Sequence, residues 1–99
     1  MTTQVQFVHA TTNQNVKELL AKKLQKIVAK YDWVINSSVI FKEENDSKGK
    51  GKICEVELSV PGPRIFASAN EDSFEKAADV TVRELQRQLK KRKASMMRH

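Results

Sequence analysis

The stretch formed by residues 73–93 constrains the fold more than any other part of the sequence. Small and apolar side chains recur there at three- and four-residue spacing: Phe74, Ala77, Ala78, Thr81, Leu85 and Leu89. Cationic side chains stand roughly opposite: Lys76, Arg83, Arg87 and Lys90. This periodicity predicts one long helix, because residues three and four apart share a face of an α-helix. One face of that helix requires a protein core, and the other suits an anionic partner.

A second helix is predicted over residues 13–31. Its apolar residues fall on one stripe: Val16, Leu20, Leu24, Ile27, Val28 and Tyr31. Its lysines gather on the other side: Lys22, Lys23, Lys26 and Lys30. Asn13 is the expected N-cap, with Thr12 and Asn15 as alternatives, since their side-chain oxygens can accept from free backbone N–H groups. Leu19 lies among the lysines, where it either packs at an edge or contacts a partner.

Four strands are predicted over residues 4–9, 36–43, 53–60 and 64–70. In the third, Cys54, Val56 and Leu58 alternate with Glu55 and Glu57. Such alternation predicts a sheet with one buried and one wet face, so both helices are expected on the buried face. The fold class is therefore α+β, in the order β-α-β-β-β-α. We expect a four-stranded mixed sheet whose first two strands are parallel and whose later strands form a meander.

The 99 residues predict a single domain, with residues 94–99 as a flexible tail. The N-terminus lacks a basic start followed by an apolar run, which argues against a signal peptide. No stretch approaches the roughly 18 consecutive apolar residues of a membrane-spanning helix. A cytoplasmic location without membrane association is the expectation.

Catalytic and metal-ligating clusters are missing from the sequence. The histidines are His9 and the terminal His99, and the single cysteine, Cys54, is expected to be an inert core thiol. We therefore predict no catalytic residue, no metal site and no cofactor. A small acyl or phosphoryl hydrolase is a less favoured alternative, because residues 9–13 contain neither arginine nor glycine for an anion-binding loop.

Positive charge is concentrated in the two predicted helices. The net charge is +6; residues 13–31 carry five lysines and one glutamate, and residues 72–99 carry eight basic and four acidic residues. Residues 32–71 are mildly acidic. Lysine on the solvent face of one helix is ordinary, but two helices with the same asymmetry predict one merged cationic surface. That surface favours contacts with a phosphate backbone over base reading.

Two further features leave alternatives open. Residues 44–52, ENDSKGKGK, form either a solvated hairpin loop or a flexible basic finger that presents Lys48, Lys50 and Lys52. Trp33 follows the first predicted helix, where it either caps one end of the core or stacks on a base.

The ordered combination of these segments resembles a known family, the bacterial ribosome hibernation promoting factors and ribosome-associated inhibitors, also called sigma-54 modulation proteins. The resemblance is carried by VQFVHATTNQNVKELLAKKLQKIVAKY, ELSVPGPRIFASA and EDSFEKAADVTVRELQRQLKKRK. The last segment is similar to the family's acidic–aromatic–alanine pattern through Asp72, Phe74, Ala77 and Asp79. Phe74 stands where tyrosine is frequent, and Ala78 where a larger aliphatic residue is common. The end at His99 resembles the short form of the family, without a dimerising C-terminal domain.

The resemblance implies a fold similar to double-stranded-RNA-binding domains and a non-catalytic, ribosome-binding function. Family members occupy the mRNA and tRNA channel of the small ribosomal subunit, inhibit translation and preserve idle ribosomes. The implied contacts to ribosomal RNA are Lys22, Lys23, Lys26, Lys30, Lys76, Arg83, Arg87, Lys90 and Lys91. The expected partner is the small subunit, with no small-molecule substrate and a monomer off the ribosome. A general structured-RNA or polyanion binder is the alternative, and both ribosome dimerisation and inactivation of single ribosomes stay open.

Overall fold

The computed structural model describes residues 2–45 and 48–96, except for the side chain of Thr2. Its elements follow the predicted order: β1 (Thr2–Val8), α1 (Gln14–Lys30), β2 (Asn36–Glu43), β3 (Lys52–Ser59), β4 (Ile65–Glu71) and α2 (Phe74–Met96). The four strands form one sheet in the order β1-β2-β3-β4. β1 pairs with β2 in parallel, while β2–β3 and β3–β4 are antiparallel, as predicted.

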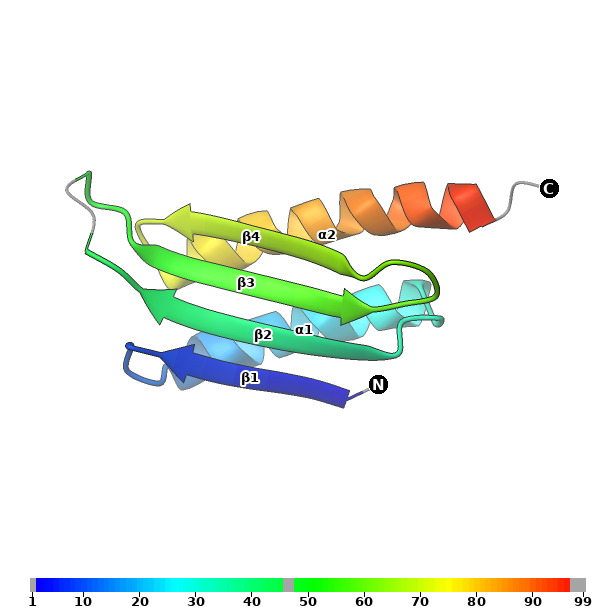
Figure 1. Cartoon of the computed structure of the whole chain (residues 1–99). Coiled ribbons are helices and arrows are strands. Elements are labelled where there is room, and N and C mark those ends of the chain that lie inside the picture. Colours follow the sequence, from blue (N-terminus) through cyan, green and yellow to red (C-terminus); the bar gives the residue numbers. More distant parts are fainter. Residues whose placement is uncertain (1, 46–47, 97–99) are drawn as a thin grey trace.

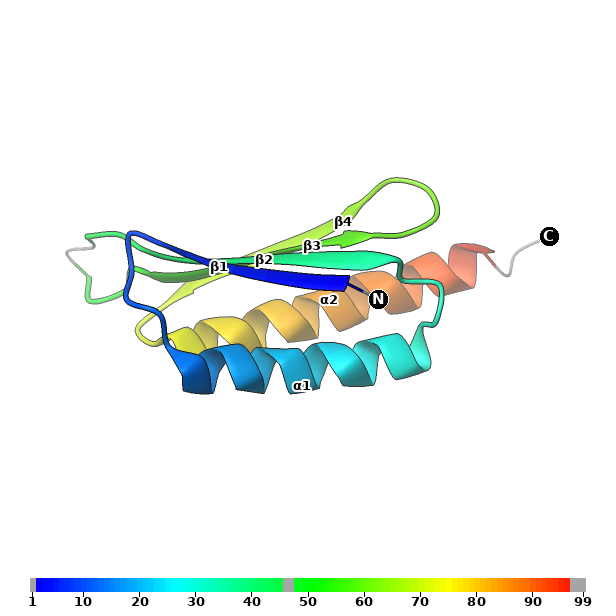
Figure 2. The ribbon, with the colours of Figure 1, turned by 90° about the horizontal axis from the view of Figure 1, so that it is seen from below.

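The molecule has two layers, with both helices on one face of the sheet (Figures 1 and 2). Within the described part of the chain, no helix or strand covers the other face of the sheet, which is called the open face below. Side chains alternate between the two faces along each strand, and this alternation determines which face the helices cover. The side chains that face the helices are fully buried: Val39 and Phe41 of β2, and Cys54, Val56 and Leu58 of β3. Their neighbours Ser38, Glu55 and Glu57 point to the open face and retain solvent contact. The prediction of a one-sided sheet is therefore confirmed.

The helices bury the stripes that the sequence predicts, except that Val28 is only half-buried against the core. Val16, Leu20, Leu24 and Ile27 of α1 are at most 2% exposed, and Tyr31 is also buried. In α2 the whole predicted stripe is buried, and Val82 joins it at one edge. The Thr81 hydroxyl lies 2.7 Å from the Ala77 carbonyl oxygen and 3.3 Å from that of Cys54, so it has polar partners inside the core.

The start of α1 agrees with the predicted Asn13 cap, and a similar cap begins α2. The Asn13 side chain accepts a hydrogen bond from the Val16 backbone N–H at 3.2 Å, and Ser73 accepts from Lys76 in the same manner at 3.2 Å. One boundary differs: α2 continues to Met96 rather than ending at Lys93. Neither glycine nor proline follows Lys93 to stop the helix, so three residues of the expected tail are helical. The remainder, 97–99, lies outside the described residues.

Strand boundaries also shift by one or two residues. β1 begins at Thr2 and ends at Val8, because His9 adopts a positive φ of 53° and turns the chain toward α1. Lys52, expected in the loop, belongs to β3 and is ion-paired with Glu43 across the hairpin. Lys48 and Lys50 are exposed. The loop is thus shorter than predicted, and the predicted basic finger loses one of its three lysines to the sheet.

Candidate nucleic-acid interface

The nine predicted RNA-contacting cations lie on the outer surfaces of the two helices. Eight of them are exposed: Lys22, Lys26, Lys30, Lys76, Arg83, Arg87, Lys90 and Lys91. Lys23 is half-buried, since its side chain turns toward α2. The cations of α2 stand on the face opposite its buried stripe, whereas Lys23 of α1 flanks the stripe on the side that faces α2.

Four of these cations, two from each helix, line one groove between α1 and α2. Lys26 and Lys30 come from α1, and Arg87 and Lys90 come from α2. The groove encloses about 280 Å³, and Ile27, Tyr31 and Gln86 form the rest of its lining. The sheet positions both helices side by side on one face, so residues some sixty positions apart in sequence converge. The predicted merging of the two cationic faces is observed at this groove, here called the interhelix groove.

The other predicted cations lie outside the interhelix groove. Lys22 and Lys23 line a hollow on the surface of α1 together with Lys26 and Leu19. Lys91 lines a hollow on the far flank of α2, beside Ile65 at the start of β4. Arg87 borders both the interhelix groove and this second hollow. Leu19 is half-buried among the lysines, so it forms part of the cationic surface rather than of the core.

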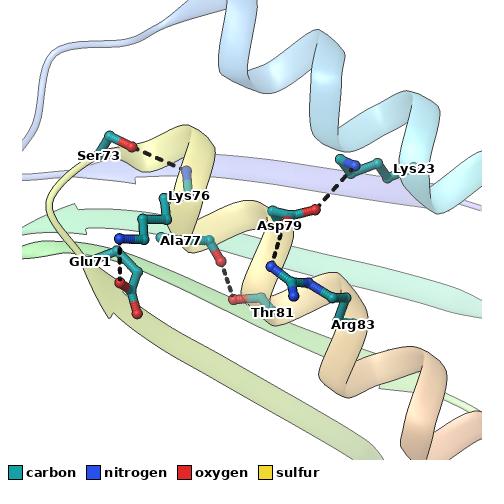
Figure 3. A network of polar contacts seen from close by, with 8 residues as sticks. All are labelled: Lys23, Glu71, Ser73, Lys76, Ala77, Asp79, Thr81 and Arg83. Atoms are coloured by element: carbon teal, nitrogen blue, oxygen red, sulfur yellow. Dashed lines mark hydrogen bonds and ion pairs between the residues drawn. The ribbon is translucent and has the colours of Figure 1, made fainter.

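Asp79, in the second turn of α2, contacts cations of both helices (Figure 3). Its Oδ1 atom lies 3.5 Å from Nζ of Lys23 on α1, and its Oδ2 atom lies 2.5 Å from Nη2 of Arg83, one turn later on α2. The hydrogen bond from Arg83 lowers the pKa of Asp79 below its ordinary value, and the charges of Arg83 and Lys23 act in the same direction. Asp79 therefore stays ionised and holds two of the predicted RNA-contacting cations.

Two other cations of the surface are also paired with acids. Both guanidinium nitrogens Nε and Nη2 of Arg87 donate to Glu84, at 3.0 and 2.7 Å, and this lowers the pKa of Glu84. Lys76 lies 3.8 Å from Glu71, so its side chain points toward the end of β4 (Figure 3). Among the described residues no acid lies within ion-pair distance of the remaining five: Lys22, Lys26, Lys30, Lys90 and Lys91.

Sequence reasoning did not separate the roles within the run from Lys90 to Lys93. Arg92 is half-buried and donates from Nη1 to the Pro61 carbonyl oxygen at 2.9 Å, so it fastens α2 to the β3–β4 turn. The Lys93 ammonium lies 5.9 Å from the centre of the Tyr31 ring, and Lys30 contacts the same ring at 5.6 Å. Tyr31 thus brings together cations from the ends of both helices, which only the tertiary structure reveals.

The remaining candidates are structural. Cys54 is fully buried, and burial raises the pKa of its thiol to about 11, which suits the predicted inert core cysteine. Trp33 packs against the core with its ring centre 5.7 Å from that of Tyr31, as the core-cap interpretation predicts. His9 is exposed at the turn after β1. Within residues 2–45 and 48–96, no helix is long and apolar enough to cross a membrane, and no His, Cys, Asp and Glu side chains cluster as a metal site.

The sequence and the fold of this chain are both similar to those of known proteins. A sequence profile of the family described as "Sigma 54 modulation protein / S30EA ribosomal protein" matches residues 3–97. A "Ribosome hibernation promoting factor" from Pseudomonas putida is 32% identical over 85 residues, which cover 86% of this chain and 79% of the relative. A ribosomal subunit interface protein from Coxiella burnetii has a similar structure, with a TM-score of 0.82 and 32% identity over 95% of this chain and 99% of that one.

A more distant structure shares the fold alone. The N-terminal domain of Protein Y from Thermus thermophilus superposes with a TM-score of 0.75 at 17% identity, over 89% of this chain and 93% of that chain. The β-α-β-β-β-α arrangement therefore persists where most side chains differ.

Proposed function

We propose a function from one premise: this chain belongs to the family of sigma 54 modulation proteins and S30EA ribosomal proteins. The function is that of a ribosome-associated factor that acts in ribosome hibernation and inhibits translation without catalysing a reaction. The protein binds the small subunit as a monomer, in the channel that mRNA and tRNA use. Ribosomal RNA is the contacted component, because the cationic surface is suited to a phosphate backbone.

The interhelix groove is the observation that supports this function most directly. It places Lys26 and Lys30 of α1 opposite Arg87 and Lys90 of α2, so a single partner must be broad enough to touch both helices. Three of these cations, Lys26, Lys30 and Lys90, have no acidic partner among the described residues and are available to phosphates. A folded RNA with phosphates on two neighbouring strands fits this requirement better than a small ligand does.

Cosedimentation with ribosomes tests the proposal. The double variant Arg83→Glu/Arg87→Glu reverses two cations of α2 and is expected to leave the protein in the supernatant at physiological salt. Lys42→Glu/Arg64→Glu is the matched control, since it changes the net charge equally on β2 and just before β4, away from the helix face. Pelleting of the α2 variant to the same extent as the parent would contradict the proposal.

Channel occupancy requires its own experiment. Small subunits saturated with the protein are expected to bind a short mRNA and tRNA poorly, and an excess of both ligands should displace the protein. Simultaneous, undiminished binding of all three would contradict occupancy of the channel while leaving ribosome association intact. Sucrose gradients of the same mixtures show whether the protein also promotes ribosome dimers.

General binding of structured RNA is the second candidate function. It is favoured by the composition of the cationic surface, in which lysines and arginines predominate and offer little direct base reading. Competition separates the two functions. A ribosome-specific factor is expected to stay on ribosomes in the presence of excess bulk RNA or anionic vesicles, whereas a general polyanion binder redistributes in proportion to phosphate.

A further inference from the structure

We propose that Asp79 is a specificity-determining residue, which restrains Lys23 and Arg83 so that they contribute little to contacts with unstructured RNA. This inference rests on the proposed function, because the specificity in question is that for the ribosome over other RNA. Asp79 would act as a positioning residue through its two cationic partners rather than through contact with RNA.

The geometry around Asp79 differs from that of an ordinary surface ion pair. Each carboxylate oxygen serves a different helix: Oδ1 faces Lys23 of α1 at 3.5 Å, and Oδ2 faces Arg83 of α2 at 2.5 Å (Figure 3). The Lys23 side chain is 31% exposed, so its ammonium is held in the seam between the helices rather than extended into solvent. A single acid thus fixes the positions of two cations and also links the helices that carry them.

This pairing has different consequences for two classes of RNA. Flexible single-stranded RNA gains affinity from each cation that newly neutralises a phosphate and releases a counterion. Lys23 and Arg83 already have a counter-charge in Asp79, so a phosphate that approaches them must compete with it. Unstructured RNA is therefore expected to use mainly the five cations of this surface that have no acidic partner among the described residues: Lys22, Lys26, Lys30, Lys90 and Lys91.

A folded RNA with fixed phosphates can use the restrained pair without breaking it. Arg83 presents five N–H donors, and the contact to Asp79 occupies one of its terminal nitrogens, so the others remain available to a phosphate. Its guanidinium is already oriented, which reduces the conformational entropy lost on binding. Asp79 therefore reduces affinity for flexible RNA more than affinity for a rigid partner of the correct spacing.

The experiment compares Asp79→Asn with the parent on two partners, ribosomes and polyuridylate. On polyuridylate the variant is expected to bind about fivefold or more tightly, with a salt slope steeper by about 0.7 for each released cation. On ribosomes it is expected to bind no more tightly than the parent. The preference for ribosomes then falls about fivefold or more because polyuridylate binds more tightly, whereas loss of structure would lower it by weakening ribosome binding.

Glu75→Gln is the matched control for charge. Glu75 is exposed in the first turn of α2, and no described cation lies within ion-pair distance of it, so the substitution adds the same net charge without releasing a cation. Asp79→Glu, which keeps the carboxylate, should restore most of the preference. An Asp79→Asn variant whose preference and salt slope equal those of Glu75→Gln would overturn the proposal.

A second measurement serves in case Asp79→Asn does not fold. In the parent background, Lys23→Gln/Arg83→Gln is expected to weaken polyuridylate binding much less than Lys26→Gln/Lys90→Gln, which removes two unpaired cations. Equal losses from the two double variants would overturn the role of Asp79. Failure of the parent to prefer ribosomes would instead overturn the proposed function, and the polyuridylate measurements would still decide whether Asp79 restrains its partners.

Discussion

Arg92 near the end of α2 donates a hydrogen bond from Nη1 to the carbonyl oxygen of Pro61, in the turn between β3 and β4, over 2.9 Å. The turn also packs tightly against Arg92 at Gly62. This residue has a φ of 87°, and a Cβ atom at its position would lie 3.3 Å from Nη1 of Arg92. One turn earlier on α2, Gln88 donates to the Phe66 carbonyl oxygen at 2.8 Å. These contacts hold the C-terminal half of α2, and the cations on it, against the sheet.

Replacement of Arg92 by alanine should therefore affect stability. We expect the free energy of unfolding to fall by about 1 kcal/mol, because a hydrogen bond from a charged donor and the packing of the side-chain stem are lost. Lys91→Ala, at an exposed neighbouring position that has no ion pair with any described residue, should change it by less than about 0.5 kcal/mol. Urea denaturation followed by circular dichroism measures both, and equal values would contradict a structural role for Arg92.

Gly62 provides a second test of the same contact. Gly62→Ala forces a residue with a side chain into a positive φ and places its Cβ against Arg92, so we expect a loss of about 1 kcal/mol or more. Gly49→Ala is the matched control: its φ of 81° imposes similar backbone strain, but no atom of the described residues lies within 4 Å of the added Cβ atom. A larger loss at Gly49 than at Gly62 would show that crowding at Arg92 is unimportant.

Phe74 tests the hydrophobic connection between α2 and the sheet. Its ring centre lies 5.5 Å from that of Phe41 and 6.3 Å from that of Phe7, both in edge contacts. Phe74→Ala should lower the free energy of unfolding by about 3 kcal/mol, because a large buried ring is removed. Phe74→Tyr should cost less than about 1 kcal/mol, because Phe74 borders a solvent-accessible hollow that can receive a hydroxyl. Thermal and urea denaturation of both variants measure this difference.

Much of the fold could be predicted from hydrophobic periodicity alone. The alternation around Cys54 and Val56 set the buried face of the sheet, and the stripe from Phe74 to Leu89 set the buried face of α2. Boundaries were less predictable, because they depend on interactions with partners distant in sequence. Lys52 was expected in a loop but belongs to β3, where it lies opposite Glu71 of β4 and pairs with Glu43 of β2.

The residues of the candidate interface could be predicted from the sequence, but their arrangement in space could not. Helical period alone placed the cations on the exposed faces, and the spacing of Asp79 and Arg83 was compatible with an ion pair within α2. The contact between Asp79 and Lys23 depends on how the two helices pack side by side on the sheet. A local sequence pattern carries no information about that packing. For the same reason, sequence could not separate Arg92, which contacts the β3–β4 turn, from the exposed Lys90 and Lys91 beside it.

The buried thiol of Cys54 predicts a pH dependence of stability. Burial raises its pKa in the folded protein from the ordinary value of 9.0 to about 11. The unfolded chain therefore loses the thiol proton first, and the stability contributed by the neutral buried thiol, complete below pH 9, declines as pH rises toward 11. We expect this group to account for a decline of roughly 2–3 kcal/mol. Urea titrations from pH 8 to 11 should show a smaller decline for Cys54→Ala, which has no thiol to ionise.

The interhelix groove predicts how binding depends on salt. Lys26 and Lys90 line it from different helices without an acidic partner among the described residues, so each can neutralise one phosphate. Lys26→Gln/Lys90→Gln should reduce the slope of log affinity for ribosomes against log salt by about 1.4–1.8, since each lost contact removes about 0.7–0.9. Lys42→Gln/Arg64→Gln removes the same charge away from the helix face, where both cations are already paired with glutamates. Its slope should match that of the parent, and an equal reduction in both double variants would mean that net charge, rather than the groove, determines binding.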